Sequence, residues 1–300
     1  MESYEHLREI VKGKLLFNEP MKYHTSLQTG GPADVLLLPK DTNDVSRVIE
    51  YANKRNIPLH VVGNGTKLLV SDRGIRGIVI KIANTLDNLN VLGERIIAEA
   101  GAPLARAVTI ATKLGLCGLE FAAGIPGTVG GAVAMNAGTY LGSMRDVVRS
   151  VTVIDLSRTL RVLTNKECGF NYRKSIFQQG NTIILKAEIS LKEGNPEEIG
   201  RKIDELMNKR RLSQPLDKPN AGCIFRNPNS VSAGKLIEDV GLKGARIGNA
   251  QISKVHANFI INLGKAKADD ILALIKLAQE RVEAKYGLQL IPEIRIMGGW

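Results

Sequence analysis

Two short glycine-rich runs limit what this chain can fold into more than any other feature of its sequence. Residues 63–67 read Gly-Asn-Gly-Thr-Lys and follow a predicted strand at residues 59–62, and residues 124–131 read Gly-Ile-Pro-Gly-Thr-Val-Gly-Gly. Glycine lets a backbone approach a ligand closely, and successive N–H groups in such a turn can bind an anion. We expect both runs to be loops between β-type segments that hold one long diphosphate cofactor. An ordinary hairpin turn is the alternative for residues 63–67 taken alone.

Neither run matches the familiar nucleotide-binding motifs. The dinucleotide fingerprint of doubly wound folds needs a glycine three residues after Gly65, where Leu68 stands. The phosphate loop of nucleotide hydrolases needs Gly-Lys-Ser/Thr, but Gly234-Lys235 is followed by Leu236. The pattern therefore favours a diphosphate cofactor bound outside a Rossmann fold.

The charge balance predicts an anionic partner. The 300 residues include 41 basic and 30 acidic side chains, a formal net charge of +11. Nucleic acid, an acidic membrane surface and phosphorylated small molecules all fit this excess. Hydrophobic residues make up 44% and charged residues 24%, which excludes wholesale disorder.

The cysteines and the N-terminus point to a cytoplasmic protein. The first six residues lack a basic-then-apolar secretory pattern. Cys117, Cys168 and Cys223 are an odd number without a Cys-x-x-Cys pair, which argues against a disulfide framework and a zinc site. The uncharged run at residues 121–144 contains six glycines, so we expect no membrane insertion, and we expect no metal site.

Hydrophobic periodicity predicts a mixture of helices and strands in irregular order, which is typical of an α+β protein. Helices are expected at residues 41–55, 103–114, 235–240 and 269–286, with another starting at residue 195. Strands are expected at residues 59–62, 78–82, 96–100, 151–154, 182–191, 259–263 and 291–300. Residues 214–220 contain two prolines and are expected to form a linker.

Several motifs together resemble a known family. Residues 25–34 (TSLQTGGPAD), 63–70, 124–131 and 136–138 (NAG) occur in the order typical of the UDP-N-acetylenolpyruvoylglucosamine reductases. Residues 172–177 (YRKSIF), 221–228 (AGCIFRNP) and 292–295 (PEIR) resemble the catalytic motifs of that family. The resemblance extends from about Thr25 to Ile296, and the compact chain is similar to the shorter, type II members.

The resemblance implies the fold and its division. It implies the α+β FAD-binding fold of the p-cresol methylhydroxylase type, with two α+β subdomains and a C-terminal α+β substrate domain. We expect FAD-binding subdomains at residues 1–83 and 84–195 and the substrate domain at residues 196–290, with a strand at residues 291–300 returning to the FAD and substrate region.

The resemblance also implies the reaction. The family reduces UDP-N-acetylglucosamine enolpyruvate to UDP-N-acetylmuramate for peptidoglycan synthesis, with NADPH as reductant and FAD as cofactor. Hydride passes from flavin N5 to C3 of the enolpyruvyl group, and a proton is added at C2. The expected partners are therefore a UDP-sugar enolpyruvyl ether and NADPH, with no nucleic acid.

Three catalytic residues follow from the matched motifs. Arg173 would stabilise the negative charge that develops on the substrate, and Glu293 would complete the polar site. Cys223 would donate the proton to C2, at a position where many family members carry serine. A thiol is a stronger acid than a hydroxyl, so a donor is kept. Without the motifs, the alternatives are a buried thiol, a surface arginine and a strand-edge carboxylate.

Binding residues are carried over in the same way. The FAD-binding candidates are Gly63, Asn64, Gly65, Thr66, Gly124, Ile125, Pro126, Gly127, Thr128, Gly130, Gly131, Asn136, Gly138 and Arg295. The first loop offers no residue typical of a covalent flavin link, so we expect non-covalent FAD. The substrate-binding candidates are Tyr140, Tyr172, Asn227, His256 and Arg210. Arg210 or Arg211 would contact the UDP pyrophosphate, and the alternative is that both lie at a solvated helix end.

Two other functions remain as alternatives. Another flavin oxidoreductase of the same fold would share the glycine-rich runs but lack the segments around Arg173, Cys223 and Glu293. A basic nucleic-acid-binding protein would account for the charge, but the chain lacks aromatic stacking platforms and a helix-turn-helix pattern.

Overall fold

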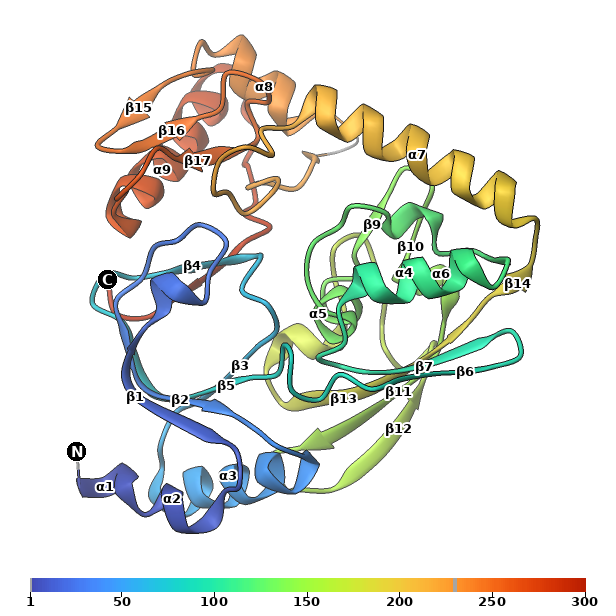
Figure 1. Ribbon diagram of the computed structural model, residues 1–300. Helices are drawn as coiled ribbons and strands as arrows, with labels where there is room; N and C mark the ends of the chain where they lie inside the picture. Colours follow the sequence, from blue (N-terminus) through green and yellow to red (C-terminus); the bar gives the residue numbers. More distant parts are fainter. Residues whose placement is uncertain (1, 229–230) are drawn as a thin grey trace. The chain divides into compact units, whose positions relative to one another are not determined.

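The chain forms two compact units, each assembled from segments that are distant in the sequence. The computed structural model describes residues 2–228 and 231–300 (Figure 1). Unit 1 comprises Met1–Phe17, Val35–Asn64 and Gly77–Asn208, and unit 2 comprises Asn18–Asp34, Gly65–Arg76 and Lys209–Trp300. The boundary falls within the first glycine-rich run, between Asn64 and Gly65. The three-part division expected from the sequence stays a prediction.

The first sheet, most of which belongs to unit 1, has the strand order β1–β2–β5–β3. These strands are β1 (Lys14–Pro20), β2 (Pro32–Leu38), β5 (Ile75–Lys81) and β3 (Leu59–Val62). Between β2 and β3 the chain forms α3 (Thr42–Arg55), whose first turn is capped by Asp41 and which ends at Asn56 with a φ of 51°. The buried side of α3 carries Val45, Val48, Ile49 and Ala52, the stripe that the sequence predicts.

The second sheet of unit 1 is antiparallel and has the order β12–β11–β13–β7–β6. Its strands are β12 (Leu160–Thr164), β11 (Val148–Asp155), β13 (Thr182–Ser190), β7 (Arg95–Glu99) and β6 (Leu89–Leu92). Shorter elements of unit 1 are α1 (Glu2–Glu5), α2 (Leu7–Ile10), α4 (Leu104–Lys113), β8 (Leu116–Cys117), η2 (Glu120–Ala122), α5 (Val129–Ala134), β9 (Gly138–Thr139), β10 (Gly142–Ser143), α6 (Met144–Val147), η3 (Ile176–Gln179) and β14 (Lys192–Glu193). Side chains from both sheets, including Ile78, Ile96 and Val151, share one apolar core.

Unit 2 has its own core, formed by a small antiparallel sheet and two helices. The sheet contains β15 (Arg246–Ile247), β16 (Ala250–Ile252) and β17 (Ile260–Asn262), and the helices are α8 (Ala233–Asp239) and α9 (Ala268–Tyr286). Helix α9 buries Ile271, Leu274, Ile275, Ala278 and Val282 and ends at Gly287. The remaining elements are η1 (Met21–Tyr23), β4 (Leu68–Val70) and β18 (Arg295–Met297), and α7 (Pro196–Ser213) crosses the boundary between the units.

Most of the expected helices and strands are confirmed within one to three residues, but two expectations are wrong. Residues 291–300 do not form one strand, because they change partner: Ile291 and Glu293 bond to the main chain of Arg226 and Ile224, and only Arg295–Met297 pairs with β4, before Gly298 with a φ of 98°. The second glycine-rich run does not lie between strands. It connects η2 to α5, because Thr128 caps the helix by accepting a hydrogen bond from the Gly131 N–H.

Across residues 2–228 and 231–300, no helix is both long and apolar enough to span a membrane.

Candidate active site

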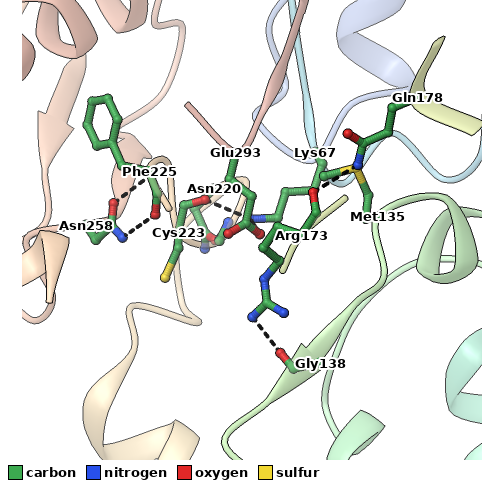
Figure 2. A network of polar contacts seen from close by, with 11 residues as sticks. Lys67, Met135, Gly138, Arg173, Gln178, Asn220, Cys223, Phe225, Asn258 and Glu293 are labelled. Atoms are coloured by element: carbon green, nitrogen blue, oxygen red, sulfur yellow. Dashed lines mark hydrogen bonds and ion pairs between the residues drawn. The ribbon is translucent and has the colours of Figure 1, made fainter. Parts of the chain in front are cut away.

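In unit 1, Arg173 stands in a tight turn. Asn171 and Lys174 exchange both main-chain hydrogen bonds, at 2.9 and 3.0 Å, so that Tyr172 and Arg173 occupy the tip between them. Arg173 has a φ of 52°, the left-handed region that a non-glycine residue adopts at a cost. Its Nη2 donates to the Gly138 carbonyl oxygen at 2.6 Å (Figure 2). The turn and this contact give the guanidinium one direction.

Buried polar side chains hold this turn in place. Asn136, 4% exposed, donates from Nδ2 to the Asn171 carbonyl at 2.8 Å and accepts from the Arg145 N–H with Oδ1. Gln178 Nε2 donates to the Arg173 carbonyl at 3.0 Å. Asn136, expected to bind FAD, therefore also has a direct structural role in supporting the arginine turn.

The parts of the glycine-rich runs that lie in unit 1, residues 63–64 and 124–131, offer a surface suited to a diphosphate. A Cβ built on Gly63 would lie 2.8 Å from Thr128 Oγ1, so the two runs are in contact. Gly124 and Gly127 have φ values of 71° and 128°, which a residue with a side chain rarely adopts. A bulky anionic group can approach the main chain of both runs closely, because the glycines carry no side chain. The residues present thus fit a diphosphate cofactor.

The end of the second run is fixed by main-chain contacts. The Val129 N–H donates to the Ala102 carbonyl and the Gly130 N–H to the Ala100 carbonyl, both at 2.9 Å. A Cβ on Gly130 would lie 2.6 Å from the Ala100 Cβ, so only glycine permits this packing. These N–H groups therefore position the run rather than face a ligand.

In unit 2, Cys223 and Glu293 share one lysine. Lys67 Nζ donates to the Cys223 carbonyl at 2.7 Å and lies 2.9 Å from Glu293 Oε1 (Figure 2). The Glu293 side chain is 10% exposed and that of Lys67 is 27% exposed. The cysteine is half-buried and does not form a disulfide bond. Two of the three catalytic candidates thus meet at a residue for which the sequence predicted no role.

Main-chain pairing holds the residues around Cys223, numbers 221–226, which we call the Cys223 segment. The Glu293 N–H donates to the Ile224 carbonyl at 2.7 Å, and the Arg226 N–H donates to the Ile291 carbonyl at 3.0 Å. Asn258, 2% exposed, bonds both the N–H and the carbonyl of Phe225 at 2.9 Å, as a neighbouring strand would (Figure 2). Cys223 and Glu293 therefore lie on paired segments.

The substrate-binding candidates belong to both units. Tyr140 and Tyr172 of unit 1 are 72% and 51% exposed. In unit 2, Asn227 Oδ1 accepts from the Ala233 N–H at the start of α8, at 3.0 Å. Burial lowers the pKa of Arg210, and the nearby Cys223, when ionised, acts in the opposite direction. Arg210 is therefore part of the surroundings of Cys223 and not a fully solvated helix end.

His256 is half-buried in unit 2. Its Nδ1 accepts from the Asn258 N–H at 3.2 Å, and its ring is tilted against Phe259 with 4.9 Å between centroids. Burial lowers the pKa of His256, the charge of Lys243 acts in the same direction, and a main-chain hydrogen bond and Glu238 oppose them, so the neutral imidazole dominates at pH 7. The Arg295 N–H donates to the Lys67 carbonyl at 2.8 Å, which ties this FAD-binding candidate to the first glycine-rich run.

Sequence reasoning missed Lys67 and Asn258. Lys67 directly follows Thr66 in the first glycine-rich run, so a cation beside an anion-binding loop was a usable signal. Nothing near Asn258 in the sequence indicates that its side chain pairs with Phe225, 33 residues away.

Comparison with known proteins identifies two matching family models. The FAD binding domain model matches residues 33–163. The model of the UDP-N-acetylenolpyruvoylglucosamine reductase C-terminal domain matches residues 214–297. The first matched range contains both glycine-rich runs, and the second contains the segments of Cys223 and Glu293.

Full-length relatives carry the same name. The UDP-N-acetylenolpyruvoylglucosamine reductase of Caldanaerobacter subterraneus subsp. tengcongensis is 50% identical over 293 residues, 97% of each chain. That of Clostridium kluyveri is 45% identical over 97% of this chain and 96% of its own. The crystal structure of the Thermus caldophilus enzyme matches with a TM-score of 0.83 at 38% identity, over 96% of this chain and 99% of that one.

These similarities confirm the α+β FAD-binding fold and FAD as the cofactor, as the sequence motifs predicted. The chain belongs to the family of UDP-N-acetylenolpyruvoylglucosamine reductases.

Proposed function

We propose that this chain reduces UDP-N-acetylglucosamine enolpyruvate to UDP-N-acetylmuramate with NADPH as reductant, in the cytoplasm. The relationship over nearly the full chain to reductases of that name supports the reaction. The observation that carries the assignment of roles is the joint contact of Lys67 with Cys223 and Glu293 in unit 2. Cys117, Cys168 and Cys223 all lie in the described residues and form no disulfide bond, which is consistent with a reducing compartment.

The reaction adds two hydrogens across a carbon–carbon double bond. The chemistry that bound FAD supplies is hydride transfer, from NADPH to C3 of the enolpyruvyl group. The two glycine-rich runs and Arg295 would hold this cofactor without a covalent link. NADPH becomes NADP⁺ when it gives up the hydride. A proton is then added at C2, and no further reactant is needed.

Cys223 supplies that proton in this proposal. Its thiol stands on a segment that main-chain hydrogen bonds and Asn258 hold in place, so its position does not depend on side-chain flexibility alone. A positioned donor of this kind typically contributes about 10²- to 10⁴-fold to a rate. The proton would be restored from solvent between turnovers.

Arg173 stabilises the negative charge that builds up on C2 and its carboxylate when hydride is added at C3. The turn between Asn171 and Lys174 and the contact with the Gly138 carbonyl fix the guanidinium before substrate arrives. A preorganised donor acts without the cost of reorganisation during the reaction. Glu293 completes the polar site beside Cys223, and Tyr140, Tyr172, Asn227, His256 and Arg210 would contact the substrate.

An absorption spectrum of the purified chain tests the proposal. We expect flavin bands that bleach when NADPH is added without oxygen and that recover on addition of UDP-N-acetylglucosamine enolpyruvate. In heavy water, deuterium should appear at C2 of the product. Protein without flavin bands would overturn the proposal. Bands that recover with oxygen but not with the substrate would indicate another flavin oxidoreductase.

A further inference from the structure

We propose that Lys67 is a positioning residue of this reaction: its ammonium group balances the charge of Glu293 and fixes the main chain that carries Cys223. This inference rests on the proposed function, because it assigns Lys67 a part in the half-reaction that reduces the enolpyruvyl substrate.

The lysine is engaged through both its side chain and its main chain. Nζ contacts the Glu293 carboxylate and the Cys223 carbonyl at 2.9 and 2.7 Å (Figure 2). Its carbonyl accepts from the Arg295 N–H at 2.8 Å, next to the β4–β18 pairing in which Leu68 is the partner of Arg295. The main chain of Lys67 is therefore held at the start of β4, and its ammonium has two specific partners.

The position of Lys67 in the chain links two parts of the site. It directly follows Gly65 and Thr66, and a Cβ on Gly65 would overlap the His24 carbonyl, so this end of the run packs tightly in unit 2. From there the side chain reaches a carbonyl 156 residues away. The cofactor run and the Cys223 segment are thus joined by a charge-assisted hydrogen bond, which is a strong contact.

Charge explains why the reaction needs this contact. Hydride addition builds negative charge on the substrate, and a largely buried carboxylate would oppose that charge if it were not balanced. The ammonium lies within ion-pair distance of Glu293, and interactions between charges are stronger in a partly buried site than in water. Lys67 would therefore act on the half-reaction that reduces the enolpyruvyl substrate and not on the oxidation of NADPH.

The first experiment separates the two halves of the reaction in Lys67→Met, Lys67→Gln and Lys67→Arg. In Lys67→Met we expect recovery of the flavin bands by the enolpyruvyl substrate to slow about 10- to 100-fold, the loss of one charge-assisted hydrogen bond to a charged group. Bleaching by NADPH should stay within about twofold of the wild-type rate. Lys67→Arg should recover part of the loss, because it keeps the charge.

A matched control is Lys235→Met, which removes a lysine from an exposed ion pair with Asp239 in the same unit. We expect both half-reactions of that variant to match the wild-type protein. Flavin content and the circular dichroism spectrum should be unchanged in all variants.

A second experiment asks whether Lys67 acts through Glu293. In a Glu293→Gln background there is no charge to balance, so Lys67→Met should cost less than about threefold. Equal losses with and without Glu293 would overturn the inference, as would a Lys67→Met variant with no loss or with equal loss in both half-reactions. Loss of flavin and of secondary structure in both Lys67→Met and Lys67→Gln would make the role structural and would overturn it too. If the wild-type protein itself is not reoxidised by the substrate, the proposed function fails and the inference with it.

Discussion

Arg173 in unit 1 and Cys223 in unit 2 are held by supports that come from different distances along the chain. The arginine depends on a tight turn between Asn171 and Lys174, and its guanidinium contacts a carbonyl 35 residues earlier in the chain. The cysteine stands on a segment whose supports include Lys67, 156 residues earlier. Both units combine main-chain hydrogen bonds with side-chain supports, but Asn136 reaches the arginine turn from 35 residues away, whereas Lys67 reaches Cys223 from 156 residues away. Substitutions at the supports should therefore have different consequences in the two units.

The largest effect is expected for Cys223→Ala in unit 2. Removal of the proposed proton donor should slow reduction of the enolpyruvyl substrate about 10³-fold, while NADPH should still bleach the flavin at the wild-type rate. Cys223→Ser keeps a donor and should retain measurable substrate reduction. Stopped-flow absorption measures the two half-reactions separately. Equal loss of both in the alanine variant would exclude the role of Cys223 as donor.

The counterpart in unit 1 is Arg173→Lys, expected to slow substrate reduction about 10²-fold. The charge is retained, but the planar fork that contacts the Gly138 carbonyl is lost, and the ammonium group can take several directions. Lys174→Ala, which changes the exposed neighbour in the same turn, is the control and should leave the rate unchanged. A rate for Arg173→Lys within threefold of the wild-type rate would show that charge alone is sufficient.

Two adjacent glycines, Gly130 and Gly131, test the main-chain packing of the second glycine-rich run in unit 1. Gly130→Ala places a Cβ 2.6 Å from the Ala100 Cβ and 3.0 Å from the Ala100 carbonyl oxygen, and should lower the free energy of unfolding by about 2 to 3 kcal/mol and reduce flavin content. Gly131→Ala meets only Thr128 Oγ1, at 3.3 Å, and should lower the free energy of unfolding by less than Gly130→Ala does. Urea unfolding and the ratio of flavin to protein absorption measure both effects. Similar losses in the two variants would contradict the packing argument.

The smallest effect concerns Cys168, the buried cysteine of unit 1. Burial, with a smaller contribution from Glu167, raises the pKa of the Cys168 thiol from its ordinary value of 9.0 to about 11. Above pH 9 the unfolded chain loses this proton before the folded chain does, so the folded state becomes relatively less stable. The stabilisation is fully present below pH 9 and is lost as the pH rises through 11, about 1 to 2 kcal/mol in all.

The measurement is urea unfolding of the wild-type protein and of Cys168→Ala between pH 8 and 11. Other groups titrate in this range, but they affect both proteins alike, so the difference between the two curves isolates the cysteine. If the difference does not change with pH, Cys168 is not responsible.

Local sequence patterns predicted a large share of this fold. The apolar stripe of residues 41–55 and the Gly287 stop after residues 269–286 correspond to α3 and α9, because periodicity and capping act over one or two turns. The same reasoning failed at residues 291–300 and after Thr128. At residues 291–300 the outcome depends on which segments are available as strand partners. After Thr128 it depends on the hydrogen bond by which the Thr128 side chain caps α5.

The candidate site divides in the same way. Sequence motifs alone singled out Arg173, Cys223, Glu293 and the two glycine-rich runs, since each motif is a short stretch with its own chemistry. Only the tertiary structure decided that Lys67 joins Glu293 to the Cys223 segment and that Asn258 pairs with Phe225. The physical reason is that a hydrogen bond or ion pair depends on distance in space. Chain folding brings residues more than a hundred positions apart to within 3 Å, and no pattern within one segment records it.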